Sequence, residues 1–129
     1  LHTSLTPETQ NLMGERELRW MKPGSYLINV SRGGVVEEDA LAQVLREGHL
    51  AGAGLDVFAS EPPAQDHPLL NLPGVPIVAT PHMGSRTTSG VRAMHEGAAE
   101  QVLQVLRGQR PEFLVNPEAW PGRMATLIL

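Results

Sequence analysis

The sequence contains no cysteine, no long apolar run and few aromatic residues, with Phe, Trp and Tyr making up 4%. Without cysteine the chain can form neither disulfide bonds nor thiolate zinc sites, and it has no thiol nucleophile. No apolar run approaches the roughly 20 residues that span a bilayer, and no segment resembles a signal peptide. We therefore expect a cytoplasmic protein with no membrane partner.

Positive charge is also scarce, because the sequence has 10 Lys and Arg residues against 14 Asp and Glu residues, which gives a formal net charge of -4. Proteins that bind nucleic acid usually concentrate basic residues in a patch, so we expect no nucleic-acid partner. Hydrophobic residues at 41% and charged residues at 19% are typical of a soluble globular protein. The 129 residues suffice for one small domain.

Apolar spacing and turn residues divide the chain into alternating helices and strands. The expected elements, in chain order, are two short helical pieces within residues 7–22, a strand at 26–30, a helix at 37–47, a strand at 51–58, a proline-broken loop at 59–76, a strand at 77–80 and a long helix from a cap at Ser85 to about residue 106. This alternation predicts an open, doubly wound parallel α/β sheet. The first strand is a nearly continuous apolar run, which favours a strand covered on both faces.

Three strands are too few for a complete doubly wound domain, and the chain begins at Leu1 rather than at a methionine. We therefore expect a fragment of a longer protein. We also expect the apolar tail at 127–129 to pack on a surface outside this sequence.

Each expected strand is followed by a side chain that can do chemistry. Arg32 follows the first strand, Asp56 ends the second with Glu61 just beyond it, and His82 follows the third. The carboxyl ends of parallel strands lie along one edge of a sheet, where open α/β folds bind ligands. Histidine exchanges protons near neutral pH, a carboxylate bound to it fixes its tautomer, and an arginine fork grips a carboxylate. These groups suit the reduction of a 2-keto acid by a hydride from a cofactor, although each of them is also common as a purely structural residue.

Several ordered blocks of sequence carry a resemblance to a known family. They are Leu-Thr-Pro-Glu-Thr at 5–9, Met-Lys-Pro-Gly at 21–24, Asn-Val-Ser-Arg-Gly-Gly at 29–34, Ala-Gly-Ala-Gly-Leu-Asp-Val-Phe at 51–58, Glu-Pro at 61–62 and Thr-Pro-His-Met-Gly-Ser at 80–85. With these blocks the chain resembles the C-terminal portion of a D-isomer-specific 2-hydroxyacid dehydrogenase, from residue 1 to about residue 117. Its ending is more similar to glyoxylate/hydroxypyruvate reductases than to phosphoglycerate dehydrogenases.

The resemblance implies a role for each candidate residue. Arg32 matches the arginine that grips the 2-keto acid, His82 matches the acid/base that protonates the carbonyl oxygen, and Glu61 matches the carboxylate bound to that histidine. Asp56 matches a residue that contacts the nicotinamide carboxamide. The full set of positions expected near the cofactor, NAD or NADP, is Ser4, Val30, Ser31, Arg32, Asp56, His82 and Gly84.

One family feature is missing from the sequence, since no Gly-x-Gly-x-x-Gly turn follows a strand. That turn places backbone amides at the pyrophosphate of a dinucleotide. We therefore expect residues 1–84 to be the C-terminal half of a Rossmann-type dinucleotide-binding domain, and residues 85–129 to be a long interdomain helix and tail that pack on a substrate domain outside this sequence.

The expected parent enzyme reduces a glyoxylate- or hydroxypyruvate-type 2-keto acid to a D-2-hydroxy acid and forms a homodimer, whereas the chain alone is expected to be inactive. The alternatives are a non-catalytic, NADH-sensing corepressor of the same fold and a degraded gene product. The retained Arg32, Glu61 and His82 favour the enzyme.

Overall fold

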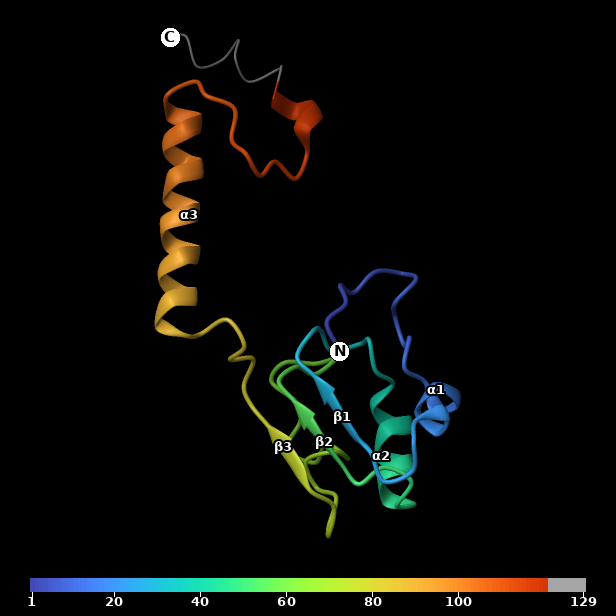
Figure 1. Ribbon diagram of the computed structural model, residues 1–129. Coiled ribbons are helices and arrows are strands. Elements are labelled where there is room, and N and C mark those ends of the chain that lie inside the picture. Colours follow the sequence, from blue (N-terminus) through green and yellow to red (C-terminus); the bar gives the residue numbers. More distant parts are fainter. Residues whose placement is uncertain (121–129) are drawn as a thin grey trace. The chain divides into compact units, whose positions relative to one another are not determined.

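The computed structural model describes residues 1–120. The chain divides into two compact units, Leu1–Gly84 and Ser85–Leu129. The first unit contains a parallel sheet with its helices, and the second contains one long helix (Figure 1).

The first unit is built in the order α1 (Glu15–Trp20), β1 (Tyr26–Asn29), α2 (Glu38–Arg46), β2 (Gly52–Leu55) and β3 (Ile77–Ala79). The strands lie in the order β1-β2-β3, and both pairs are parallel. The open parallel α/β sheet predicted from the sequence is therefore confirmed. Because parallel strands all run the same way, their carboxyl ends share one edge of the sheet.

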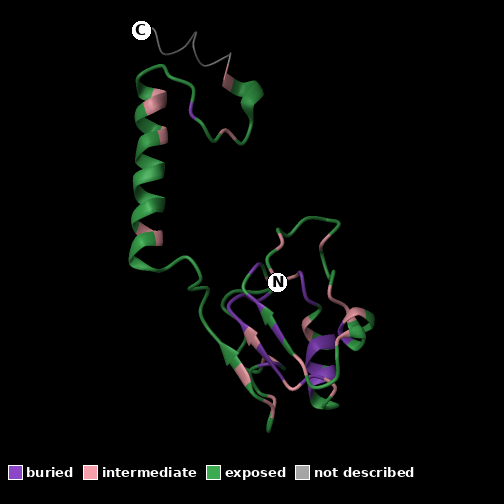
Figure 2. Cartoon of the chain, in the orientation of Figure 1, coloured by how far each residue is buried: buried purple, intermediate pink, exposed green. Residues whose placement is uncertain are grey.

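Helix α2 forms most of the core. Its predicted apolar face is buried, and it packs with Leu18 of α1 and with Leu27 and Leu55 of the sheet. The buried residues of α2 are Ala40, Leu41, Ala42, Val44 and Leu45. Figure 2 shows this burial concentrated on α2 within the first unit, whereas β3 has no buried residue. The helices α1 and α2 thus cover one face of the sheet.

Within the first unit, residues 1–84, the other face of the sheet is exposed, which differs from the expectation that the first strand is covered on both faces. Alternate residues of β1 are buried, whereas Tyr26 and Ile28 are 60% and 51% exposed. Because successive side chains of a strand point to opposite faces, the run places apolar side chains on both faces, and the first unit covers only one of them.

Helix α2 ends as the sequence predicted. Gly48 adopts a φ of 75°, its N–H donates to the Leu45 carbonyl, and the His49 N–H donates to the Val44 carbonyl. This is the Schellman arrangement, in which a C′ glycine takes the left-handed conformation. The expected helix near residue 7 is wrong: residues 7–11 form turns, and α1 begins only at Glu15.

The second unit begins with α3 (Thr88–Leu106) and continues to a short 3₁₀ helix, Pro117–Ala119. The predicted cap at Ser85 is wrong, because the Thr87 side chain accepts the Gly90 N–H at 3.0 Å and caps the helix. The residues just before Ser85 belong to the first unit, where the amides of Met83 and Gly84 donate to Asp56. The tail at 127–129, expected to pack on another surface, lies outside the described residues.

Candidate active site

The turn after β1 is organised from inside by Asn29, whose side chain is almost completely buried. Its Oδ1 accepts the Ser31 N–H at 3.1 Å and the Ser31 hydroxyl at 2.7 Å, and its Nδ2 donates to the Arg32 carbonyl at 2.9 Å. These bonds fix the backbone of Ser31 and Arg32 while the Arg32 side chain stays exposed. One guanidinium nitrogen, Nη1, donates to the Ser31 carbonyl at 2.7 Å. The rest of the five-donor fork is directed to the surface, where it suits an anionic ligand.

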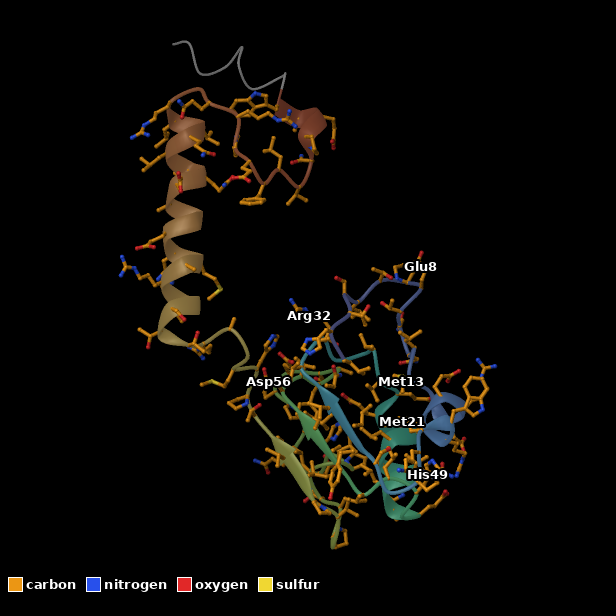
Figure 3. All side chains as sticks on the ribbon, viewed as in Figure 1. Glu8, Met13, Met21, Arg32, His49 and Asp56 are labelled. Atoms are coloured by element: carbon orange, nitrogen blue, oxygen red, sulfur yellow. The ribbon has the colours of Figure 1, made fainter. Side chains whose placement is uncertain are left out.

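The turn after β1 also lies against the segment that follows β2. A Cβ atom on Gly33 would lie 2.0 Å from the Phe58 carbonyl oxygen, so only glycine fits at this position. This close approach brings Arg32 towards the loop that carries Glu61. Figure 3 shows Arg32 and Asp56 at the same end of the sheet.

Asp56, which follows β2, holds the loop after β3. The Thr80 hydroxyl and the Met83 N–H both donate to Oδ1, the latter at 2.7 Å, and the Gly84 N–H donates to Oδ2 at 2.7 Å. These bonds, that of Thr80 above all, lower the pKa of Asp56. Asp56 is therefore a buried carboxylate anion that ties together the residues on both sides of His82.

His82 has a φ of 53°, which is uncommon for a residue with a side chain and adds local strain. Its Nδ1 lies 2.8 Å from Oε2 of Glu61, whose Oε1 accepts the Phe58 N–H at 3.1 Å. The bond to His82 and then the Phe58 N–H lower the pKa of Glu61, and the positive charge of Arg32 adds to this effect. An ionised carboxylate only accepts hydrogen bonds, so Nδ1 must be the donor. Nε2 is then free to exchange a proton with a ligand.

The expected residues gather into two adjoining groups within the first unit. Asp56, Glu61 and His82 line a pocket of about 420 Å³ whose walls include Phe58 and Leu70. Ser4, Val30, Ser31 and Arg32 line a second hollow. Gly84 is joined to the first group through Asp56. Arg32 does not line the same pocket as His82.

Two residues that organise the site were not singled out from the sequence. Thr80 binds Asp56, and Asn29 shapes the turn that carries Arg32. A polar residue inside the apolar run of the first strand was the available signal for Asn29. Thr80 precedes a proline at the end of a short strand, and nothing in its sequence setting distinguishes it from an ordinary strand-end residue.

The side chains present fit the nicotinamide end of a dinucleotide cofactor. Within residues 1–120, Oδ2 of Asp56 accepts one hydrogen bond and keeps capacity for an amide N–H such as that of a carboxamide. The glycine-rich turn that would bind the pyrophosphate does not occur in the sequence.

The described residues include no group of three or more His, Asp or Glu side chains that could hold a metal ion. Nor does the described part of the chain contain a helix long and apolar enough to cross a membrane.

Comparisons with known proteins agree with this architecture. Residues 1–84 match the family model described as D-isomer specific 2-hydroxyacid dehydrogenase, NAD binding domain. Over 118 residues the chain is 46% identical to a glyoxylate reductase of Thermofilum pendens, covering 92% of this chain and 34% of that protein. Over 114 residues it is 47% identical to a glyoxylate/hydroxypyruvate reductase B of Pectobacterium carotovorum, and the match covers 88% of this chain and 35% of that protein.

A similar fold is present in the NAD-complexed crystal structure of a D-isomer specific 2-hydroxyacid dehydrogenase from Lactobacillus delbrueckii. The TM-score is 0.79 at 36% identity, over 90% of this chain and 39% of that one. The chain spans about a third of the length of the curated relatives it matches.

Proposed function

We propose that this chain, which belongs to the D-isomer specific 2-hydroxyacid dehydrogenase family, carries the residues of a larger enzyme that bind and reduce its substrate. That enzyme would use NADH or NADPH to reduce a small 2-keto acid to a D-2-hydroxy acid. The observation that carries the proposal is the bond between Nδ1 of His82 and Glu61, because it leaves Nε2 available at the edge that also carries Arg32.

In the proposed reaction, Arg32 binds the carboxylate of the 2-keto acid through its exposed guanidinium fork, and its positive charge polarises the neighbouring carbonyl. A reduced nicotinamide supplies a hydride when bound. His82 gives the proton on Nε2 to the carbonyl oxygen, so that one hydride and one proton convert the C=O bond to CH–OH. Glu61 keeps Nδ1 protonated and holds the imidazole in position throughout.

Asp56 has two proposed tasks. It ties down the loop that carries His82 through Thr80, Met83 and Gly84. The remaining acceptor capacity of Oδ2 would bind the carboxamide of the nicotinamide, with Ser4, Val30, Ser31 and Gly84 lining the same end of the cofactor. We also propose that residues 1–84 belong to the dinucleotide-binding domain, that residues 85–129 pack on a substrate domain, and that the full-length enzyme is a homodimer.

Glyoxylate and hydroxypyruvate are the proposed substrates, and the names of the two relatives support this choice. The isolated chain is proposed to turn over little or no substrate, because its sequence has no glycine-rich pyrophosphate turn. The test uses a chimera in which this chain replaces the matching 118-residue segment of the Thermofilum pendens glyoxylate reductase.

The chimera and the isolated 129-residue chain are assayed side by side on a panel of 2-keto acids, with NADH and with NADPH. We expect reduction of glyoxylate or hydroxypyruvate by the chimera and none above background by the isolated chain. A folded chimera that binds NADH but reduces no 2-keto acid would contradict the enzymatic proposal and favour an NADH-sensing protein. Substantial turnover by the isolated chain would contradict the proposal that it is inactive alone.

A further inference from the structure

Glu38, in the first turn of α2, binds the long loop between β2 and β3 at two points. Its Oε1 accepts the Ala59 N–H at 2.7 Å, and its Oε2 lies 3.1 Å from Nε2 of His67. Both side chains of the pair are largely buried, with 19% of Glu38 and 14% of His67 exposed. One side chain on a rigid helix therefore fixes the loop where it leaves β2 and again eight residues later.

The hydrogen bonds of His67 assign its tautomer. Its Nδ1 accepts the Leu69 N–H at 3.3 Å, so this nitrogen carries no proton. Nε2 must then carry the proton and donate it to Glu38. Leu69 is buried in the core, and the Asn71 side chain donates to the His67 carbonyl. His67 is thus held from several sides, and its ring cannot change tautomer without losing a bond.

The anchored part of the loop contacts the candidate active site through Phe58. The Phe58 ring packs edge-on against the His67 ring, with centroids 5.3 Å apart. The Phe58 N–H donates to Oε1 of Glu61, whose other oxygen binds His82. A continuous series of contacts therefore runs from α2 through Glu38, His67 and Phe58 to Glu61.

We propose that Glu38 and His67 form a latch that positions Glu61, and through it sets the orientation of His82. This inference rests on the proposed function, and it makes Glu38 and His67 positioning residues rather than catalytic ones. The loop needs such an anchor because its prolines interrupt backbone hydrogen bonding, and the Glu61 side chain itself is 39% exposed. The five prolines are Pro62, Pro63, Pro68, Pro73 and Pro76.

Glu38→Gln tests the latch with little change in shape. The glutamine side chain keeps one oxygen, which can accept only one of the two bonds. Its NH₂ group must then face either the Ala59 N–H or the N–H at Nε2 of His67, and because both of these are donors, that hydrogen bond is lost. Asp39→Asn is the matched control, since it removes one negative charge from the same helical turn, and Asp39 is exposed to solvent. The two variants are compared in the chimera and in the 129-residue chain.

In the chimera we expect Glu38→Gln to lower kcat about tenfold with KM within about twofold, because a small misplacement of a reacting group is costly. Asp39→Asn should stay within about twofold of the parent. In a Glu61→Gln background the further effect of Glu38→Gln should shrink below about twofold, because residues that act through one another are not additive. An equal loss in both backgrounds, or no loss, would overturn the latch.

In the 129-residue chain, hydrogen exchange at the Phe58 amide gives a readout that needs no activity. We expect exchange about tenfold faster in Glu38→Gln than in Asp39→Asn, and equal rates would overturn the latch. An inactive chimera in which only Glu38→Gln speeds this exchange would instead refute the proposed function and leave the latch standing.

Discussion

Replacing Asp56 by asparagine tests the carboxylate that holds the His82 loop. The amide oxygen can keep the bonds from Thr80 and Met83, but the NH₂ group would then face the Gly84 N–H that now donates to Oδ2 at 2.7 Å. Bonds to a charged group contribute about 1.5–3 kcal/mol each and neutral ones about 1 kcal/mol. The variant loses the bond from the Gly84 N–H, which remains accessible to water, and it weakens the bonds from Thr80 and Met83. Together these changes should lower the free energy of unfolding by about 2–3 kcal/mol at pH 7.

The pH dependence of this loss identifies its origin. Hydrogen bonds, first of all from Thr80, lower the pKa of Asp56 in the folded chain, whereas the pKa of an unfolded aspartate is about 3.9. A depressed folded pKa contributes stability that is fully present above the unfolded pKa and is lost as pH falls through the folded pKa. The difference between wild type and Asp56→Asn should therefore be constant from pH 8 to about pH 5 and shrink below about pH 4.

Urea denaturation of the 129-residue chain at a series of pH values measures this difference directly. Asp66→Asn is the control, because Asp66 is an exposed aspartate in the loop between β2 and β3. It should change the free energy of unfolding by less than about 0.5 kcal/mol. A difference for Asp56→Asn that stays constant down to pH 3 would refute the reasoning that the charge of Asp56 holds the loop.

Two further substitutions examine the turn after β1. Gly33→Ala should lower the free energy of unfolding by about 3 kcal/mol, because its Cβ would lie 2.0 Å from the Phe58 carbonyl oxygen. Gly48→Ala, at a φ of 75° with open space around it, should cost only about 1–2 kcal/mol, and equal losses in urea denaturation would contradict the close approach at Gly33. Arg32→Ala in the chimera should lower kcat/KM for glyoxylate by about a hundredfold, since charged hydrogen bonds to the substrate carboxylate are lost. An unchanged kcat/KM would contradict its assignment as the substrate anchor.

Local sequence signals predicted the elements whose formation depends on local interactions. The period of apolar residues and the C′ glycine defined α2 to within one residue at each end, because both signals lie within the helix itself. The start of α3 could not be predicted in the same way. Ser85 and Thr87 are both good caps, and the sequence does not distinguish between them, whereas in the structure Thr87 caps the helix.

The sequence predicted where in the fold the candidate site lies, but it did not predict the contacts between the side chains of the site. The order of strands and helices placed Arg32 after the first strand, Asp56 at the end of the second and His82 after the third. In the structure all three follow neighbouring parallel strands, since β2 ends at Leu55. The bond between His82 and Glu61 and the Glu38–His67 pair join residues far apart in the chain. The pair Glu38 and His67 are separated by 29 positions, and no local pattern relates them.

The most direct test of the central claim is the rate of NADH oxidation with glyoxylate by the chimera and by its His82→Gln variant. NADH binding is measured on both by fluorescence. If Nε2 of His82 gives the proton to the carbonyl oxygen, His82→Gln should lower kcat by about a hundredfold or more and change the NADH dissociation constant by less than about threefold. A near-normal kcat in His82→Gln would contradict the assignment of His82 as the proton donor.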